Sequence, residues 1–482
     1  MIGFVLITAL VIDISVAVAG PVADTYIQAA AFCSSSDAKY KLSQFDPPVK
    51  GSGTPNGMSL WQLQVDDTTS GYKQKVTGFG AAVTDATVAV LNRLASDKKQ
   101  NLLKQLMTSD GVNFSLMRHT VASSDLSSDP VYTYDDNGGN VDASISSFNL
   151  GGSGRTMAAT LKSMRALNPG LTILGSTWSP PGWMKLNKLV TGTTVNNNLN
   201  LSYVKQYAQY FVKYLQAYEQ SGAHIDAITI QNEPLNSKAG FPTMYISASQ
   251  AANLIQQNIG PALKNASLAT QIWAYDHNTD EPDYPDTIVN AAPRYVQATA
   301  WHCYAANNKW SVLTDFHNKH PGIQQYMTEC WTSPYTGWSQ AADFTMGPLQ
   351  NWASGSMAWT LGSDTNYGPH LADSDACGSC RGLFVVDTSA GTYDFAIDYY
   401  MMGQFSKFIP KGATILAGTG SWTYDDGTGL QSVASVNPDG CKTVVITNKF
   451  QNDVYVTVNF KSGSQWSGRV YKESVVTWTL LG

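Results

Sequence analysis

The stretch His224-Ile-Asp-Ala-Ile-Thr-Ile-Gln-Asn-Glu-Pro234 decides the fold. Residues 225–230 form a short apolar and β-branched run, which is typical of a strand buried on both faces, as in a parallel sheet. Pro234 cannot donate a hydrogen bond to a neighbouring strand, so the strand ends before it. Glu233 is therefore expected at the C-terminal end of a parallel strand, where α/β barrels place their chemistry.

Strand-like and helix-like segments alternate through most of the chain, from residue 76 to residue 409. This alternation predicts a (β/α)8 barrel with long loops. A doubly wound open sheet is the alternative fold, but no glycine-rich phosphate loop of the dinucleotide-binding type follows the first strand. The expected barrel strands are residues 76–82, 113–120, 171–177, 225–231, 271–275, 296–302, 324–329 and 356–361.

Among the helical patterns between these strands, the clearest runs from Ser202 to Gly222, with apolar side chains along one face. Ser202 is the expected N-cap, and Gly222 is expected to stop the helix. The last helical pattern begins near Tyr393 and is ended by Pro410, which cannot continue a helix.

The two ends of the chain predict a second, smaller domain. After Pro410, runs of β-branched and aromatic residues alternate with Gly, Asn and Asp turns, which indicates a small antiparallel β domain. Extended pieces before residue 76 are expected to complete it, so that both chain ends build the side domain. The expected organisation is a signal peptide at 1–19, N-terminal strands of the side domain at 20–75, the barrel at 76–409 and the rest of the side domain at 410–482.

Composition and the first residues set the environment of the protein. Apolar residues make up 43% and charged residues 14% of 482, as in folded proteins. The net charge of −6, without a basic cluster, argues against nucleic acid or an anionic membrane as a partner. The apolar run 4–12 and the cleavage pattern Ala17-Val-Ala19 predict a secretory signal, although Asp13 and the lack of a preceding Lys or Arg depart from the usual form. No later stretch is apolar enough to span a bilayer, so a soluble, secreted protein is expected.

Six cysteines are compatible with three disulfides outside the cell. Cys377-Gly-Ser-Cys380 is interpreted as a local disulfide rather than half of a zinc site, because no second Cys or His pair follows at ligand spacing. Neighbouring expected strands bring Cys303 and Cys330 together, and Cys33 with Cys441 is then the remaining pair. Glycosylation sequons begin at Asn113, Asn200 and Asn265.

A second glutamate ends another strand-like run, Gln324-Gln-Tyr-Met-Thr-Glu329. By their order in the chain, Glu233 and Glu329 end strands four and seven, which face each other across the mouth of an eight-stranded barrel. Two carboxylates about 5–5.5 Å apart suit retaining glycoside hydrolysis, with one as acid/base and the other as nucleophile. A lone strand-end glutamate is more often structural. The pairing, in a chain with 13 Trp and 24 Tyr, favours the catalytic interpretation.

Further motifs occur in a specific order around these two glutamates. They are Gly78-Phe-Gly80 with Thr84-Asp85, Leu116-Met-Arg-His119 running to Ser124-Asp125, Ser176-Thr-Trp-Ser-Pro-Pro-Gly-Trp183, Gln231-Asn-Glu-Pro234, Trp301-His-Cys-Tyr304 and Met327-Thr-Glu-Cys-Trp331. With this set the sequence resembles glycoside hydrolase family 30, in particular its fungal endo-β-1,6-glucanases, over essentially the whole mature chain.

The resemblance implies a (β/α)8 barrel with a β-sandwich side domain, and hydrolysis with retention that needs no cofactor and no metal. It implies Glu233 as general acid/base, Glu329 as nucleophile, and Arg118, at the end of strand two, as the cation that orders the nucleophile. The expected substrate-binding residues are Asn232, Asp125, Trp178, His302, Tyr304, Trp331 and Trp359, and the end of strand five, Tyr275-Asp-His277, is a further candidate for lining the groove. The ordinary alternatives are a turn-forming Asp125, a packing His302 and core aromatics.

The resemblance, through loop segments such as 132–136 and 191–198, selects β-1,6-glucan as the substrate and internal cleavage as the mode. β-1,6-Galactan, xylan and glucosylceramide are alternatives on the same scaffold. An inactive carbohydrate-binding protein is the alternative from another class, and the presence of both glutamates argues against it. His119, His302 and His370 show no ligand spacing, which argues against a metalloenzyme. A monomer acting on a polysaccharide is expected.

Overall fold

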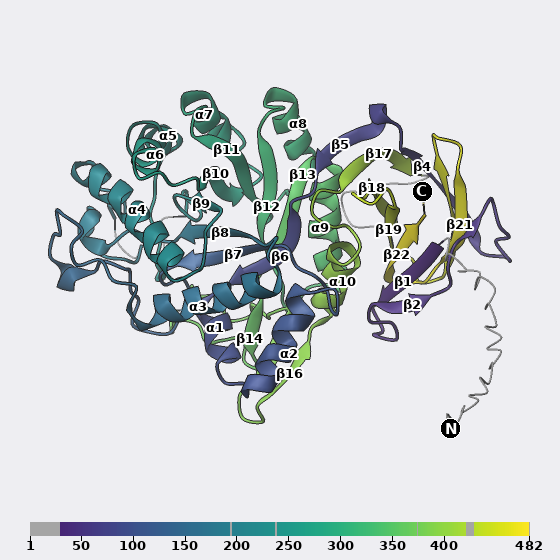
Figure 1. The fold of residues 1–482 in the computed structure, drawn as a ribbon, viewed down its shortest axis with the longest axis horizontal. Helices are drawn as coiled ribbons and strands as arrows, with labels where there is room; N and C mark the ends of the chain where they lie inside the picture. Colours follow the sequence, from purple (N-terminus) through teal and green to yellow (C-terminus); the bar gives the residue numbers. More distant parts are fainter. Residues whose placement is uncertain (1–28, 193–194, 237–238, 374, 421–428, 482) are drawn as a thin grey trace, which may run out of the picture.

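The computed structural model describes residues 29–192, 195–236, 239–373, 375–420 and 429–481; the expected signal peptide at 1–19 lies outside the described residues. The barrel and the side domain lie next to each other along the long axis of the molecule (Figure 1). Within the described part of the chain, no helix combines the length and the apolar character that crossing a membrane requires.

Eight parallel strands close into a barrel in the order β10-β11-β12-β13-β6-β7-β8-β9. They are β6 (Gly78–Val83), β7 (Leu116–Val121), β8 (Thr172–Thr177), β9 (Ala227–Thr229), β10 (Gln271–Asn278), β11 (Val296–His302), β12 (Gln324–Trp331) and β13 (Ala353–Trp359). Each of the eight expected strands overlaps one of these, so the predicted (β/α)8 barrel is confirmed. The interior of the barrel is packed, with the rings of Trp273 and Tyr326 stacked 3.9 Å apart.

Helices cover the outside of this barrel (Figure 1). They are α1 (Asp85–Leu91), α2 (Ser96–Met107), α3 (Gly151–Leu167), α4 (Val204–Gln220), α5 (Ala248–Leu254), α6 (Gly260–Asn265), α7 (Asp283–Ala291), α8 (Ser311–Lys319), α9 (Gln340–Gln350) and α10 (Ile397–Ser406). Short 3-10 turns occur at Thr69–Gly71, Asn137–Gly139, Gly182–Met184 and Leu201–Tyr203, and a π-helical turn, Ile255–Ile259, joins α5 to α6.

The start of α4 differs from the expectation and its end agrees. Ser202 is not the N-cap, because it lies in the 3-10 turn before the helix, where its N–H donates to the side chain of Asn200 over 3.1 Å. Gly222 does stop the helix. It takes a positive φ of 79°, its N–H donates to the Glu219 carbonyl, and the next N–H donates to the Tyr218 carbonyl. This pair of bonds is the Schellman arrangement.

The expectation for the last helix was wrong at its start. Tyr393 lies in the strand β16 (Thr392–Phe395), where it pairs with Val386 of β15 (Phe384–Asp387) in a small sheet completed by β14 (Gly362–Asp364). The alternating aromatic residues of β16 favour this strand pairing. Helix α10 begins only at Ile397, after the chain leaves that sheet.

The side domain interleaves strands from both ends of the chain, as predicted. Its sheet order is β2-β1-β22-β19-β18-β17-β4-β20-β21-β3, with β5 paired to β17. All these pairs are antiparallel except β4 with β20. The strands are β1 (Ala29–Ser35), β2 (Ser43–Phe45), β3 (Val49–Lys50), β4 (Ser59–Asp66), β5 (Tyr72–Lys75), β17 (Thr414–Gly420), β18 (Leu430–Val436), β19 (Lys442–Asn448), β20 (Val454–Phe460), β21 (Gln465–Val470) and β22 (Ser474–Leu480).

Helices α9 and α10 lie between the barrel and the side domain (Figure 1). Polar contacts connect the two: Gln350 of α9 donates to the Ser432 carbonyl over 2.7 Å, and Thr477 of β22 donates to the Gln404 carbonyl of α10 over 2.8 Å. The side domain is therefore fixed against the barrel through these helices.

Two of the three expected disulfides form, Cys303–Cys330 and Cys377–Cys380. The third was wrong, because Cys33 and Cys441 are free. Cys33 of β1 pairs with a residue of β22, and the same residue of β22 pairs with Ile446 of β19. Cys33 and Ile446 therefore lie at the same height in the sheet. Cys441 precedes β19 and lies five residues before Ile446 along the direction of that strand, which is about 17 Å at the usual rise per residue. A disulfide needs Cα atoms within about 7 Å.

Candidate active site

A pocket of about 200 Å³ opens at the C-terminal ends of the barrel strands. Most of the expected substrate-binding residues line it, together with residues from the loops after strands four and eight. The lining consists of Asp125, Trp178, Asn232, Glu233, Phe241, Tyr304, Glu329, Trp331, Trp359, Asp375, Cys377 and Cys380. Two further expected residues, Arg118 and His302, are fully buried behind this lining. The structure therefore brings all ten expected site residues together.

Glu233 lies just beyond β9, which ends at Thr229 and is shorter than expected. The backbone of Glu233 is in the left-handed region, with φ 45°, a conformation that costs a residue other than glycine about 1–3 kcal/mol. Its N–H donates to the Asp276 carbonyl over 3.0 Å, and the N–H of Asn232 donates to the Thr177 carbonyl over 2.7 Å. These bonds tie the segment to the strands on both sides of β9.

Polar side chains hold the Glu233 carboxylate from two directions. Nδ1 of His302 lies 3.2 Å from Oε1, and Nδ2 of Asn236 donates to Oε2 over 2.9 Å. Nδ1 of His277 lies 4.0 Å from Oε1. The side chain of Glu233 is 14% exposed, so one edge of the carboxylate faces the pocket.

Glu329 is held by a different set of donors. It lies within β12, two residues before the strand ends, and its side chain is 7% exposed. Nη1 of Arg118 donates to Oε2 over 2.5 Å, and the Tyr304 hydroxyl donates to Oε1 over 3.0 Å. Both bonds favour the ionised carboxylate.

Arg118 links this carboxylate to the rest of the site. It lies inside β7 rather than at its end, and its long side chain reaches the barrel mouth while remaining fully buried. Its Nη2 donates to Asn232 over 2.6 Å, to Asp276 over 2.9 Å and to Ser176 over 3.2 Å. The guanidinium group thus fixes Glu329 and Asn232, which flanks Glu233, in one geometry.

Asp276 is the buried counter-ion of this network. The sequence predicted it only as a residue that lines the groove, so its role as counter-ion was not predicted. A β-bulge in β10 turns it inward, with φ 68°. Its two oxygens accept hydrogen bonds from Ser176, Thr229 and Thr328 at 2.6–2.7 Å, and Oδ1 lies 3.0 Å from Nε2 of His302. Its position at the end of strand five was the only available signal.

His302 bridges the two candidate catalytic carboxylates. Its Nδ1 lies 3.2 Å from Oε1 of Glu233 and 3.9 Å from Oε1 of Glu329, so these oxygens are no more than about 7 Å apart. This upper limit includes the carboxyl separation of about 5–5.5 Å that retaining glycosidases use.

The pKa values of the two glutamates depend on His302. Burial raises the pKa of Glu329, while the charges of His302 and Arg118 oppose that rise. Burial also disfavours an ionised Glu233, but the hydrogen bond and the charge of His302 outweigh it and lower the pKa of Glu233 to about 2. While His302 is protonated, Glu233 is therefore the stronger acid, which is opposite to the order that a general acid requires.

The 3.2 Å contact between Nδ1 of His302 and Oε1 of Glu233 is short enough for a proton to move from one atom to the other. Asp276 is held as an anion, so Nε2 of His302 donates to it, and Nδ1 faces Oε1 of Glu233. With the proton on Nδ1 the pair is an imidazolium and a carboxylate. With the proton on Oε1 the pair is a neutral imidazole and a carboxylic acid, the form that can protonate a leaving group.

Aromatic rings form the floor and the rim of the pocket. Trp178 and Trp359 stack with centroids 5.3 Å apart, and the Arg118 guanidinium lies 4.7 Å from the Trp178 ring. Both Trp side chains are almost fully buried, whereas Trp331 and Phe241 are only half-buried. Phe241 comes from the loop after strand four, and no sequence signal predicted it at this site.

Asp125 is supported by the loop that carries the second disulfide. Its carboxylate is buried, and the N–H of Cys377 donates to Oδ2 over 3.3 Å. Burial raises the pKa of Asp125 to about 7, and the negative charge of Glu329 adds to this. The same loop contacts the loop after strand four, where the N–H of Gly240 donates to Asp375 over 3.2 Å. Two loops thus meet beside the pocket.

Comparison with known proteins agrees with both halves of the fold. The glycosyl hydrolase family 30 TIM-barrel domain model matches residues 76–409, and the family 30 beta sandwich domain model matches residues 419–478. The chain is 64% identical over 457 residues to the endo-1,6-beta-D-glucanase of Neurospora crassa, covering 94% of this chain and 95% of that protein.

Two further proteins support the same comparison. Identity to the endo-1,6-beta-D-glucanase neg1 of Aspergillus fumigatus is 58% over 463 residues, covering 94% of each chain. The solved structure of the endo-beta1,6-glucanase BT3312 superimposes with a TM-score of 0.83 at 25% identity, covering 94% of this chain and 100% of that chain.

Proposed function

The chain belongs to glycoside hydrolase family 30, and we propose that it cuts β-1,6-glucan internally, with retention of configuration, using Glu233 as general acid/base and Glu329 as nucleophile. As a family member it is a glycoside hydrolase, and its identity to the Neurospora crassa enzyme makes it a β-1,6-glucan hydrolase. The observation that carries the residue assignment is the pair of carboxylates, both in contact with His302 at the barrel mouth.

In the first step, the Glu329 carboxylate attacks the anomeric carbon of a glucosyl unit, and Glu233 gives its proton to the O6 oxygen of the leaving unit. The C1–O6 bond breaks, a glycosyl ester with Glu329 forms, and the remainder of the chain leaves with a free 6-hydroxyl. The bonds from Arg118 and Tyr304 hold the attacking carboxylate in one orientation, which lowers the entropic part of the barrier.

In the second step, Glu233 acts as a base. Its carboxylate takes a proton from a water molecule, the oxygen of that water attacks the anomeric carbon, and the ester bond to Glu329 breaks. Two inversions at the same carbon give net retention. The fixed partners of Glu233, His302 and Asn236, keep it in position for both steps.

The remaining pocket residues supply sugar contacts in this proposal. Arg118 donates a hydrogen bond to Oδ1 of Asn232. The NH2 group of the Asn232 amide is therefore directed toward a hydroxyl next to the cleaved bond. The carboxylate of Asp125 is placed to accept from another sugar hydroxyl. Trp178 and Trp359 offer apolar surface against a sugar face, and Trp331 extends that surface to the rim.

The test is hydrolysis of a linear β-1,6-glucan by the purified protein and by its Glu329→Gln variant. The products are resolved by size, and NMR identifies the anomeric configuration of the product that is released first. We expect rapid release of oligosaccharides as β-anomers by the parent only. Activity on galactan or xylan, with none on this glucan, would leave the mechanism standing and reject the substrate. A variant as active as its parent would reject Glu329 as nucleophile.

We further propose that the protein acts outside the cell as a monomer. The signal-like pattern at residues 4–19 and the two disulfides support an extracellular location. Analysis of culture medium for a product lacking the first residues tests secretion, and light scattering of the purified protein tests the oligomeric state.

A further inference from the structure

Three potential metal ligands converge at the candidate acid/base. Oε1 of Glu233 lies 3.2 Å from Nδ1 of His302 and 4.0 Å from Nδ1 of His277. The three residues each offer one ligand atom, and these atoms all lie within 4.8 Å of one another. His277 was not among the scattered histidines from which the sequence argued against a metal.

The two histidines differ in the hydrogen bonds that their ring nitrogens make. Nε2 of His302 lies 3.0 Å from Asp276, whose oxygens are held in turn by Thr328 and Arg118. A carboxylate on the far nitrogen is the usual outer partner of a metal-bound histidine, because it fixes the ring and its tautomer. Nδ1 of His277 is buried and has no hydrogen-bond partner in the described part of the chain.

The spacing suits a small transition-metal ion. Zinc binds nitrogen and carboxylate oxygen at about 2.0–2.2 Å, so that tetrahedral ligand atoms lie about 3.3 Å apart. The spacing of 3.2 Å between Oε1 of Glu233 and Nδ1 of His302 already meets this value. His277 lies 4.0 Å from Oε1 and within 4.8 Å of the His302 ligand atom, so it has to approach these atoms by up to about 1.5 Å. Imidazole ligands favour zinc and copper over magnesium or calcium.

We propose that Glu233, His277 and His302 form a binding site for Zn²⁺ or an ion of the same class, and that the bound ion inhibits hydrolysis reversibly. The ion occupies Oε1 of Glu233 and Nδ1 of His302, the two atoms between which the catalytic proton lies. Glu233 then has no proton to give to a leaving group. Metal binding stands without the proposed function, whereas inhibition rests on it.

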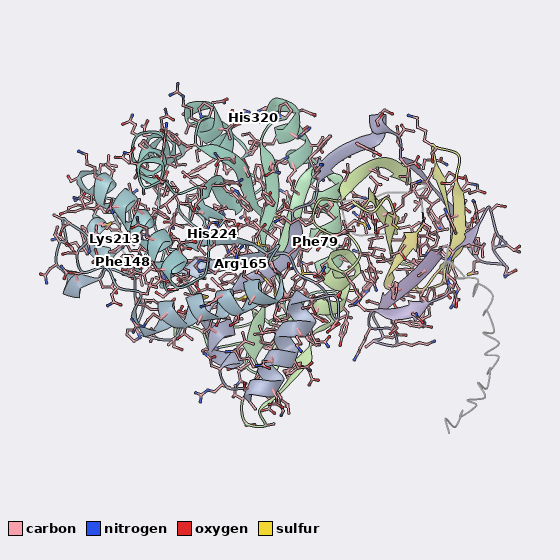
Figure 2. All side chains as sticks on the ribbon, in the orientation of Figure 1. Phe79, Phe148, Arg165, Lys213, His224 and His320 are labelled. Carbon is pink, nitrogen blue, oxygen red and sulfur yellow. A yellow bond between two sulfur atoms is a disulfide. The ribbon has the colours of Figure 1, made fainter. Side chains whose placement is uncertain are left out.

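The binding test uses the full-length protein and Co²⁺, which has visible absorption bands that report tetrahedral nitrogen and oxygen ligation. We expect one Co²⁺ per chain, displaced by Zn²⁺. In His277→Gln, and in His277→Asn as a second variant, affinity should fall by at least about tenfold. The matched control is His224→Gln, which removes an exposed histidine between Glu219 and Asp226 near the other end of β9 (Figure 2).

The activity test compares each protein with its own metal-free rate on β-1,6-glucan. We expect Zn²⁺ to inhibit the parent, EDTA to restore it, and the His277 variants to need at least about tenfold more Zn²⁺. Equal Co²⁺ affinity in parent and His277 variants, or loss of binding in His224→Gln alone, would overturn the site. An active parent that Zn²⁺ does not inhibit would overturn the regulation. If the parent binds Co²⁺ tightly but does not hydrolyse the glucan, the proposed function is rejected and the metal site still stands.

Discussion

Nη1 of Arg118 donates to Oε2 of Glu329 over 2.5 Å, and both side chains are buried. The other end of the same guanidinium group donates to Asn232 and Asp276. One rigid, planar cation therefore sets the relative positions of the candidate nucleophile and of the residue that precedes the acid/base.

The first prediction concerns this cation. In Arg118→Lys, a single ammonium group replaces the forked guanidinium group, and it cannot reach Glu329 and Asn232 together. We expect kcat on β-1,6-glucan to fall about 100-fold, equivalent to about 3 kcal/mol of transition-state stabilisation, with a smaller change in KM. Steady-state kinetics measure this, and thermal unfolding checks the fold. A folded variant with kcat within about threefold of the parent would contradict the positioning role.

The second prediction concerns the hydroxyl on the other oxygen of Glu329. Tyr304→Phe removes a hydrogen bond of 3.0 Å to a carboxylate while keeping the ring. Bonds to charged groups contribute about 1.5–3 kcal/mol, so kcat should fall between about 10-fold and 150-fold. Because the lost bond stabilised the ionised carboxylate, the acidic limb of the kcat/KM profile should shift to higher pH. An unshifted profile would mean that the hydroxyl serves the substrate and not Glu329.

The third prediction concerns the Cys377–Cys380 disulfide, which lines the pocket and whose Cys377 N–H donates to Asp125. Replacing both cysteines with serine frees this loop, so Asp125 loses its fixed orientation. We expect KM to rise about tenfold while kcat changes by less than about threefold, since Asp125 is proposed to bind sugar and not to react. The matched control is Cys441→Ser, which removes a free thiol in the side domain. An equal rise in both proteins would reject the link.

The fourth prediction concerns stability against acid. His119 is buried, its Nδ1 donates to the Thr120 carbonyl over 3.0 Å, its Nε2 accepts from the Tyr214 hydroxyl, and burial lowers its pKa from 6.5 to about 3. Only the unfolded chain takes up a proton between these two values. The free energy of unfolding should therefore fall as pH falls through that window, by up to about 1.4 kcal/mol per pH unit.

The measurement is the melting temperature at pH values from 7 to 4 for the parent and for His119→Gln. We expect the variant to be less stable at pH 7, since it loses packing, but to lose less further stability as the pH falls. His119→Asn, a second variant that removes the imidazole, should show the same reduced slope as His119→Gln. Parallel curves for all three proteins would exclude His119 as the source of the acid sensitivity.

The barrel and its two glutamates could be predicted because their signals are local. The apolar run 225–230 and the polar residues after it encode a strand end directly, and chain order alone makes Glu233 and Glu329 end strands four and seven. The start of α4 was misplaced because Asn200 and Ser202 are equally suitable capping residues, and only the folded backbone decides between them.

Other features depend on long-range geometry that no local pattern encodes. Asp276 looks like one more strand-end carboxylate until a bulge in β10 turns it beneath the pocket toward Arg118. Asn236 and Phe241 reach the site through the course of a loop. The wrong Cys33–Cys441 pair came from elimination, whereas strand register places these thiols at different levels of one sheet.

The pairing of β1 with β22 has a consequence for how this protein is made. The first strand of the side domain leaves the ribosome more than 400 residues ahead of its partner, which at about 5–20 residues per second is a delay of roughly 20 to 90 seconds. The whole barrel is synthesised within that interval. Until the last strand arrives, β1 presents an open edge to other chains, so this delay is when the protein is most exposed to aggregation.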